Sequence, residues 1–297
     1  MSVLDEARAR GGHGRGPTIP GLVLADDLVT PLDPVAPDVE PCHDATGDPL
    51  AYCRATNGSL RVDMPDLASF SYERGASHVK AIPHRPLPPG LVLETYHHCV
   101  LPLILPALGI EVLHASAAGG TAGVAALCGP SGTGKSTFAV ALGRRGYPIW
   151  ADDAVAVDLG GHVPTAVPLP FTVRLHPSSA RLLGSADAGG IAPGTWPGYR
   201  RRTPLAVLCM LRRAPEATAS VELEQLEAAA ACLAALGHAY CFSLKDAALK
   251  RRMIGNYLTI VGQVPVYEIR FRPGPEHLPA VLDAIEELLG HVACERG

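Results

Sequence analysis

The most informative segment of this 297-residue sequence is Gly129-Pro130-Ser131-Gly132-Thr133-Gly134-Lys135-Ser136-Thr137. It fits the pattern of a phosphate-binding loop, in which a glycine and four further residues precede Gly-Lys-Ser. Residues 123–128 before it are predicted to form a buried β-strand, and residues 138–145 after it a helix. A strand, a glycine-rich turn and a helix direct backbone N–H groups and the positive helix end toward a phosphate. The stretch therefore predicts that the chain binds a nucleoside triphosphate.

The residue types inside this loop predict separate contacts. Lys135 is expected against the β- and γ-phosphates, and the Ser136 hydroxyl is expected on Mg²⁺. The chain contains four lysines against twenty-one arginines, so a lysine would rarely fall at this position by chance. The alternative is a glycine-rich turn that binds nothing. The predicted nucleotide-binding residues are Gly129, Ser131, Gly132, Thr133, Gly134, Lys135, Ser136 and Thr137.

The composition argues against several classes of partner and location. A net charge of −4 gives no sign of binding to nucleic acid or to an anionic membrane surface, and 5% aromatic residues suggest no base-stacking platform. The first residues lack the apolar region of a secretory signal, and no apolar run free of charge and proline is long enough to span a bilayer. The eight cysteines form no Cys-x-x-Cys pair. We expect a reduced, cytoplasmic protein.

Three regions are predicted along the chain. Residues 1–20 are expected to be a flexible tail, because they contain little hydrophobic sequence to order them. Short alternating segments predict a small β-rich N-terminal subdomain over residues 21–90. Residues 91–297 are expected to form the domain that contains the loop. The strands expected in the subdomain are 60–64, 68–72 and 78–82.

A helical stretch is predicted over residues 90–108, at the junction of these two regions. It carries His97-His98-Cys99, which together with Cys42-His43 could be drawn as a zinc site. Adjacent histidines on a helix point about 100° apart, so one ion could not easily use both. A packed helix between the two regions is the favoured interpretation.

Three further residues are candidates for chemistry. His114 lies in an alternating segment that leads through a hairpin into the strand before the loop. Two interpretations stay open for it, a buried hydrogen-bonded histidine and a histidine near the phosphates. Asp152 and Asp153 interrupt an apolar strand sequence over residues 149–157. Two acids among apolar residues are costly unless they meet a cation or a reacting group, although a solvent-exposed turn is the alternative. Because successive strand residues point to opposite faces, the two acids are expected to have different roles.

The remaining sequence predicts a positively charged loop and the rest of the sheet. Residues 185–202 are rich in glycine and proline, end in Arg200-Arg201-Arg202, and are interpreted as a mobile loop over the site. With Arg174, these arginines are candidates for phosphate or acceptor contacts, and a solvated basic loop is the alternative. Strands broken by prolines are expected over 163–175, further strands at 205–211, 221–225 and 264–270, and helices at 178–184, 226–237, 243–255 and 275–292.

Several of these segments together resemble the HPr kinase/phosphorylase family. They are Leu113-His114-Ala115-Ser116, the loop, Arg145-Gly146-Tyr147 and Ala151-Asp152-Asp153. Pro265-Val266-Tyr267 is similar to a feature of the smaller HPr-kinase-like proteins of biosynthetic clusters. The resemblance covers roughly residues 91–293. It implies an α/β fold, a P-loop kinase core with a mixed β-sheet and flanking helices, here preceded by the β-rich subdomain.

The resemblance also implies an activity. Members of this family transfer a phosphoryl group from a nucleotide to a serine hydroxyl, on HPr itself or on a peptide such as a lasso precursor. ATP and Mg²⁺ are the implied cofactors, with Lys135 and Ser136 on nucleotide and metal. His114, Asp152 and Asp153 would lie at the reaction centre, with Asp152 favoured as the base and Asp153 as a metal or hydrogen-bonding partner. A carboxylate base suits phosphoryl transfer, which needs positioning and charge neutralisation more than covalent help.

The leading hypothesis is an ATP-dependent kinase that acts on a serine hydroxyl of a peptide or small protein. A kinase for a small hydroxylated metabolite and a nucleotide-binding regulatory module without transferase activity are the alternatives. The Asp152-Asp153 pair argues against the module, because pure binding needs no base. The basic loop suits an acidic or extended acceptor. True HPr kinases are hexamers, so a homo-oligomer stays open.

Overall fold

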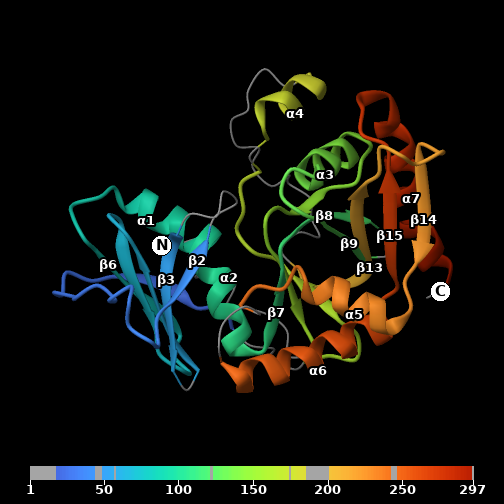
Figure 1. Ribbon diagram of the computed structural model, residues 1–297. Coiled ribbons are helices and arrows are strands. Elements are labelled where there is room, and N and C mark those ends of the chain that lie inside the picture. Colours follow the sequence, from blue (N-terminus) through green and yellow to red (C-terminus); the bar gives the residue numbers. More distant parts are fainter. Residues whose placement is uncertain are drawn as a thin grey trace.

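Short alternating segments in the first third of the chain form a six-stranded mixed sheet (Figure 1). The computed structural model describes residues 18–43, 49–56, 58–120, 123–173, 175–184, 201–241 and 246–295, with side chains to residue 290 except that of His43. In sheet order the strands are β1 (Gly21–Leu24), β6 (His78–Pro83), β5 (Ala68–Tyr72), β4 (Ser59–Met64), β3 (Pro49–Thr56) and β2 (Glu40–His43). The three strands predicted here lie within β4, β5 and β6. The predicted tail lies outside the described residues up to residue 17.

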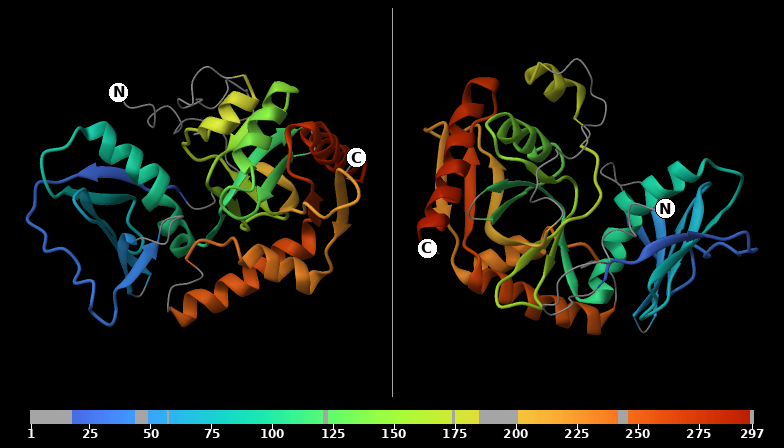
Figure 2. Two further views of the ribbon diagram at one scale, coloured as in Figure 1. Left: turned by 45° about the horizontal axis from the view of Figure 1, so that its top comes forward. Right: turned by 180° about the vertical axis from the view of Figure 1, so that it is seen from behind.

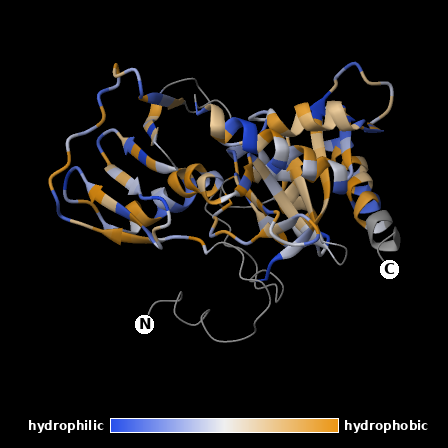
Figure 3. Ribbon diagram, turned by 90° about the horizontal axis from the view of Figure 1, so that it is seen from below, coloured by the Kyte–Doolittle hydropathy of each residue, from blue (hydrophilic) through white to orange (hydrophobic). Residues whose placement is uncertain are grey.

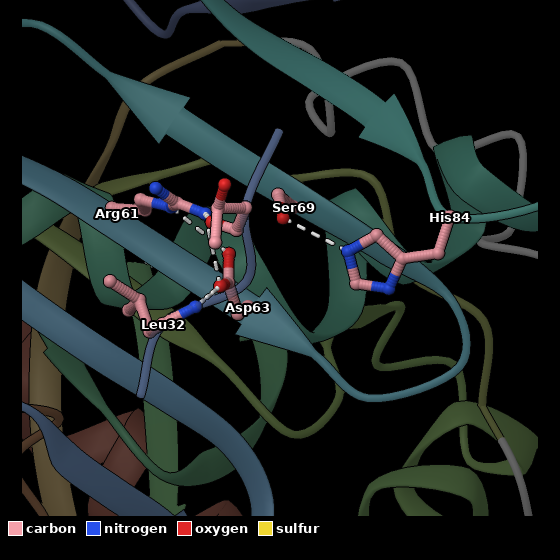
Figure 4. Close-up of polar contacts among 6 residues, drawn as sticks. Leu32, Arg61, Asp63, Ser69 and His84 are labelled. Carbon is pink, nitrogen blue, oxygen red and sulfur yellow. Dashed lines mark hydrogen bonds and ion pairs between the residues drawn. The ribbon is translucent and has the colours of Figure 1, made fainter. Parts of the chain in front are cut away.

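A buried carboxylate fastens the connection between β1 and β2 onto this sheet (Figure 4). Asp63 is 3% exposed, and its carboxylate accepts two hydrogen bonds of 3.1 Å from the Arg61 guanidinium and one from the Leu32 backbone N–H. A buried carboxylate needs such partners, because an unpaired one would lose its hydration without compensation. Ser69 and His84 bond at 2.9 Å and tie the chain after β6 to β5.

A continuous helical segment joins this sheet to the rest of the chain and lies between the two sheets in Figures 1 and 2. It consists of α1 (Pro89–Thr95), the π-helical turn η2 (Tyr96–Val100), α2 (Leu101–Ile104) and the 3₁₀ turn η3 (Leu105–Leu108). The sequence predicted a helical stretch over residues 90–108, and the structure divides it into four consecutive helical pieces over Pro89–Leu108. Pro102 and Pro106 lack the N–H that a regular helix would use, which accounts for breaks at the later turns.

The segment Pro89–Leu108 is also long and apolar enough, by length and composition alone, to cross a membrane. This is weak evidence, because 44% of its window is buried inside the structure. Tyr96, Leu101 and Leu105 are at most 1% exposed and belong to a hydrophobic cluster that includes residues of both sheets. The cytoplasmic location and the division of the chain at residue 90 stay predictions.

The second sheet has nine strands. In order they are β10 (Ile149–Ala151), β8 (Ala115–Gly120), β9 (Gly123–Cys128), β13 (Thr203–Arg213), β12 (Thr165–Val167), β11 (Val155–Asp158) and β7 (Ile110–Leu113), with β15 (Val266–Phe271) beside β13 and β14 (Val221–Gln225) beside β15. β9, β13 and β15 are parallel, and the other pairs are antiparallel. Over 163–175, where several strands were expected, the described residues form only β12 as a named strand.

Helices cover both faces of this sheet because its central strands are apolar on both sides. Figure 3 colours these strands as hydrophobic along much of their length. In β9, Val124 and Ala126 join the cluster that contains α5 (Ala228–Leu236) and α6 (Ala247–Gln263). The alternate residue Leu127 joins the cluster of α3 (Lys135–Arg144) and α7 (Leu278–Glu295). The chain therefore has a mixed α/β architecture, completed by the short helices α4 (Pro177–Leu182) and η4 (Pro275–His277).

Candidate functional site

The glycine-rich loop, residues 129–134, connects the end of β9 to the start of α3. At Gly129 an added Cβ would lie 2.9 Å from the Leu211 carbonyl oxygen, so the position has no room for a side chain. Gly132 and Gly134 have φ of 76° and 114°, which other residues rarely adopt. The loop thus curls over the N-terminus of α3, where unpaired backbone N–H groups bind anions. It also lies at the carboxyl ends of the parallel strands, where α/β sheets bind ligands.

Lys135 lies at the mouth of this loop and is 7% exposed. Its ammonium donates to the Gly129 carbonyl at 2.9 Å and to the Pro130 carbonyl at 3.4 Å, and it lies 3.2 Å from His114 Nε2. Burial lowers the pKa of Lys135, and the nearby Asp153 acts in the opposite direction. The Lys135 ammonium is therefore held beside the N-terminus of α3 by two carbonyl oxygens and the His114 ring.

His114 does not lie within a strand, as the sequence suggested, but at the bend between β7 and β8. Its two ring nitrogens have different partners. An ammonium can only donate and a carbonyl can only accept, so Nε2 accepts from Lys135 and Nδ1–H donates to the Asp153 carbonyl at 3.2 Å. Burial and the Lys135 charge lower the pKa of His114. The histidine is therefore a neutral bridge between the lysine and the aspartate backbone.

Asp152 lies in the connection between β10 and β11 and is 4% exposed. Its Oδ1 accepts a hydrogen bond of 2.6 Å from the Ser116 hydroxyl, and the Ser136 hydroxyl also bonds to this carboxyl group. Burial raises the pKa of Asp152 to about 6, against the opposing effect of the Ser116 hydrogen bond. The two serine oxygens are 3.5 Å apart. The side-chain oxygens of Asp152, Ser116 and Ser136 therefore lie close together at the first turn of α3.

Asp153 is exposed and is the centre of a three-residue turn. The Ala154 N–H donates to the Asp152 carbonyl at 2.8 Å, and Asp153 has φ of 63°. Such γ-turns with positive φ are rare and strained. The Asp153 carbonyl accepts hydrogen bonds of 3.2 Å from both His114 and the Tyr240 hydroxyl, which hold the turn in place. The turn separates the two acids, because Asp152 is buried while Asp153 is exposed.

Sequence reasoning missed His238, Tyr240 and Arg213 at this site. The His114 N–H donates to the His238 carbonyl at 2.7 Å, and the Tyr240 ring meets the His114 ring edge-on at 6.1 Å. Burial, Lys135 and His114 lower the pKa of His238 to about 4. Arg213 Nε donates to the Thr133 carbonyl at 3.3 Å. The position of Arg213 at the end of a buried strand was a usable signal, whereas nothing in the sequence connects 238–240 with His114.

A cavity of about 1620 Å³ opens onto these groups. Loop residues 131–137, His114, Asp153, His238, Tyr240 and Arg213 line it. Asp152 is not part of its wall. Arg201 and Arg202 do not line it either, and Arg202 forms an ion pair with Asp158. Arg174 and Arg200 lie outside the described residues. Of the arginines in the predicted basic loop, the two that the structure describes, Arg201 and Arg202, therefore lie away from the cavity. Arg213 lines the cavity instead.

Two metal hypotheses can be compared with this arrangement. Among the described residues, no group of three or more His, Cys, Asp or Glu side chains could hold a metal ion. Cys42, one of the residues proposed for zinc, has its Sγ 2.7 Å from Cys53 Sγ. Mg²⁺ needs fewer protein ligands, since one or two carboxylates combine with phosphate oxygens and water. Asp152, Ser136 and Ser116 offer the hard oxygen atoms that such a site uses.

No protein family model and no curated protein matches this sequence. Among solved structures, the chain is similar to the Hpr(Ser) kinase/phosphatase from Coxiella burnetii, with 13% sequence identity over 63% of this chain and 99% of that chain. The TM-score of 0.35 is too low for this likeness to support an activity or to assign a residue.

Proposed function

We propose that this chain is a kinase that transfers the γ-phosphoryl group of ATP to a serine hydroxyl of a peptide or small protein. The observation that carries the proposal is the placement of two aspartates beside a glycine-rich helix N-terminus. Asp152 is hydrogen-bonded to Ser116 behind the loop, and Asp153 lines the cavity in front of it. A phosphoryl-transfer site needs one group to hold the donor and its metal and another to face the acceptor.

In this proposal the backbone N–H groups of the loop and the Lys135 ammonium hold the phosphate chain, so the loop acts as a P-loop. Ser136 and Asp152 would hold Mg²⁺, with Ser116 orienting the Asp152 carboxylate through its 2.6 Å hydrogen bond. Bound Mg²⁺ would supply charge neutralisation to the phosphate oxygens. Arg213, fixed by the Thr133 carbonyl, adds a second positive charge at the cavity wall.

The burial of the two aspartates favours the reverse of the roles that the sequence suggested. A base must first be able to reach the proton that it removes, and only then does its pKa matter. Asp153 is exposed to the cavity, whereas Asp152 is 4% exposed and already hydrogen-bonded to hydroxyl groups. Asp153 therefore takes the proton of the acceptor hydroxyl, and Asp152 serves the metal side.

His114 acts in this proposal as a positioning residue. Its Nε2 lone pair is engaged by Lys135, and its Nδ1–H is engaged by the Asp153 carbonyl. Neither nitrogen is free to exchange a proton with an acceptor. Tyr240 is a second positioning residue, because its hydroxyl donates a hydrogen bond to the same Asp153 carbonyl. A regulatory module that only binds nucleotide would have no use for a strained, doubly held aspartate.

Mass spectrometry tests the activity directly. The full chain is incubated with Mg-ATP and serine-containing peptides, and the peptides are analysed for a phosphate adduct on serine. Lys135→Ala is the control, which should form no adduct. If nucleotide binds but no peptide is modified, the chain is not a peptide kinase. Adducts on small alcohols alone would instead identify a metabolite kinase.

A further inference from the structure

The cavity does not end at the reacting groups. Past His114 it continues to the six-stranded sheet and to the η2–α2 turn, where Glu40 and His98 are among its lining residues. The part of the wall that matters here, which we call the sheet-side wall, consists of Cys42, Leu50, Ala51, Val62, Met64 and Leu103. One continuous space therefore joins the glycine-rich loop to residues of β2, β3, β4 and α2.

The register of the small sheet explains why four of these residues, Cys42, Ala51, Val62 and Met64, share one face. Cys42 of β2 lies opposite Ala51 of β3, and Cys53 of β3 lies opposite Val62 of β4. Side chains that alternate along a strand share a face, so Cys42, Ala51 and Val62 all point to the side of the helical segment. β2 is the last strand of the sheet, so no strand of the described residues pairs with it on that border.

Charge and size differ between the two ends of the cavity. The loop end is lined by Lys135, Arg213 and Arg272. Glu40 and His98 line the other end, whereas the six residues of the sheet-side wall contribute only carbon and sulfur side-chain atoms. The volume of about 1620 Å³ exceeds the roughly 300–1000 Å³ that small-molecule sites usually enclose. A charged small metabolite would find partners at the loop end but none along the sheet-side wall.

We propose, on the basis of the kinase function above, that the sheet-side wall binds the acceptor as an extended peptide with apolar residues beside the phosphorylated serine. The serine then lies at Asp153, and its apolar neighbours cover the exposed Leu50 and the half-buried Leu103. The small N-terminal sheet is thus the acceptor-recognition part of the chain. The acceptor is selected by apolar contacts rather than by the positive charge of residues 185–202.

Two synthetic peptide pools with a central serine test this inference. One pool carries Leu, Val and Ala at the flanking positions, and the other carries Asp, Glu and Lys. We expect kcat/KM for the apolar pool to be about tenfold or more above that of the charged pool, as burial of one or two aliphatic side chains allows.

Leu50→Asp provides the second arm, because Leu50 is 44% exposed and its replacement need not disturb folding. It should raise the KM of the apolar pool by about tenfold, with a smaller change in kcat. Val23→Asp is the matched control, since Val23 is 46% exposed on the opposite edge of the same sheet and does not line the cavity. It should leave the KM of the apolar pool as in the wild type.

The outcomes separate the two proposals. Equal kcat/KM for both pools, or equal effects of Leu50→Asp and Val23→Asp, would overturn the sheet-side wall while leaving the kinase function intact. Absence of phosphate on every peptide, with nucleotide still bound, would overturn the kinase function itself. A preference for the charged pool would mean that basic residues, and not the sheet-side wall, select the acceptor.

Discussion

Replacing Asp152 with asparagine keeps the shape of the side chain and removes a buried ionisable group. The pKa of Asp152 rises from an ordinary value of 3.8 to about 6 in the folded protein. Between these values the unfolded chain is ionised while the folded chain keeps its proton, so stability falls as pH rises from about 4 to about 6 and levels off above that. A pKa about two units higher corresponds to about 3 kcal/mol. The Asp152→Asn variant does not lose this stability, because its asparagine side chain cannot ionise.

Urea unfolding of both proteins at pH 4 and pH 7, without Mg²⁺ or nucleotide, measures this effect. Other titrating groups cancel in the difference between the variant and the wild type. That difference should shift in favour of Asp152→Asn by up to about 3 kcal/mol from pH 4 to pH 7. In a protein that keeps Asp152, Ser116→Ala should enlarge the loss of stability between pH 4 and pH 7, because the Ser116 hydrogen bond lowers the Asp152 pKa. A stability difference that is the same at both pH values would show that the Asp152 pKa is not raised in the folded protein.

Three further substitutions test the loop and the strained turn. Lys135→Ala should weaken nucleotide binding by about 100-fold or more in calorimetry, as expected for a lost charge-assisted contact to phosphate, and unchanged affinity would remove the lysine from the site. Gly129→Ala places a Cβ 2.9 Å from the Leu211 carbonyl, so we expect a loss of about 1–3 kcal/mol in urea unfolding together with weaker nucleotide binding. Tyr240→Phe removes one of the two hydrogen bonds to the Asp153 carbonyl, and kcat should fall about tenfold while the KM for ATP stays near wild type. A change confined to the KM for ATP would contradict the positioning role.

The sequence predicted the parts of the site that depend on neighbouring residues. The spacing of glycines around Lys135 and the apolar run before it are local signals, and β9, the loop and α3 follow them. The two aspartates were singled out because charge within an apolar strand is costly. The hairpin before the loop was also predicted, since Gly120 pairs with Gly123 as its turn residues suggest.

The parts that sequence reasoning missed depend on contacts between distant segments. The role of His114 follows from Lys135 on one side and the Asp153 carbonyl on the other, and no local pattern announces such partners. Tyr240 reaches the site because its segment pairs with the distant β7, where the Tyr240 N–H donates to the Val112 carbonyl at 2.9 Å. Which aspartate is buried depends on the γ-turn at Asp153, a conformation that non-glycine residues adopt too rarely for prediction from sequence.

The roles proposed for the two aspartates are tested by comparing phosphoryl transfer by Asp153→Asn and Asp152→Asn in single-turnover experiments across a Mg²⁺ titration. We expect Asp153→Asn to transfer about 10²–10⁴-fold more slowly than the wild type, with the same half-saturating Mg²⁺, because it lacks the base. Asp152→Asn should need more Mg²⁺ and recover part of its rate at high Mg²⁺. Wild-type transfer by Asp153→Asn, or an unchanged Mg²⁺ dependence in Asp152→Asn, would contradict the assignment of a metal side and an acceptor side to the two aspartates.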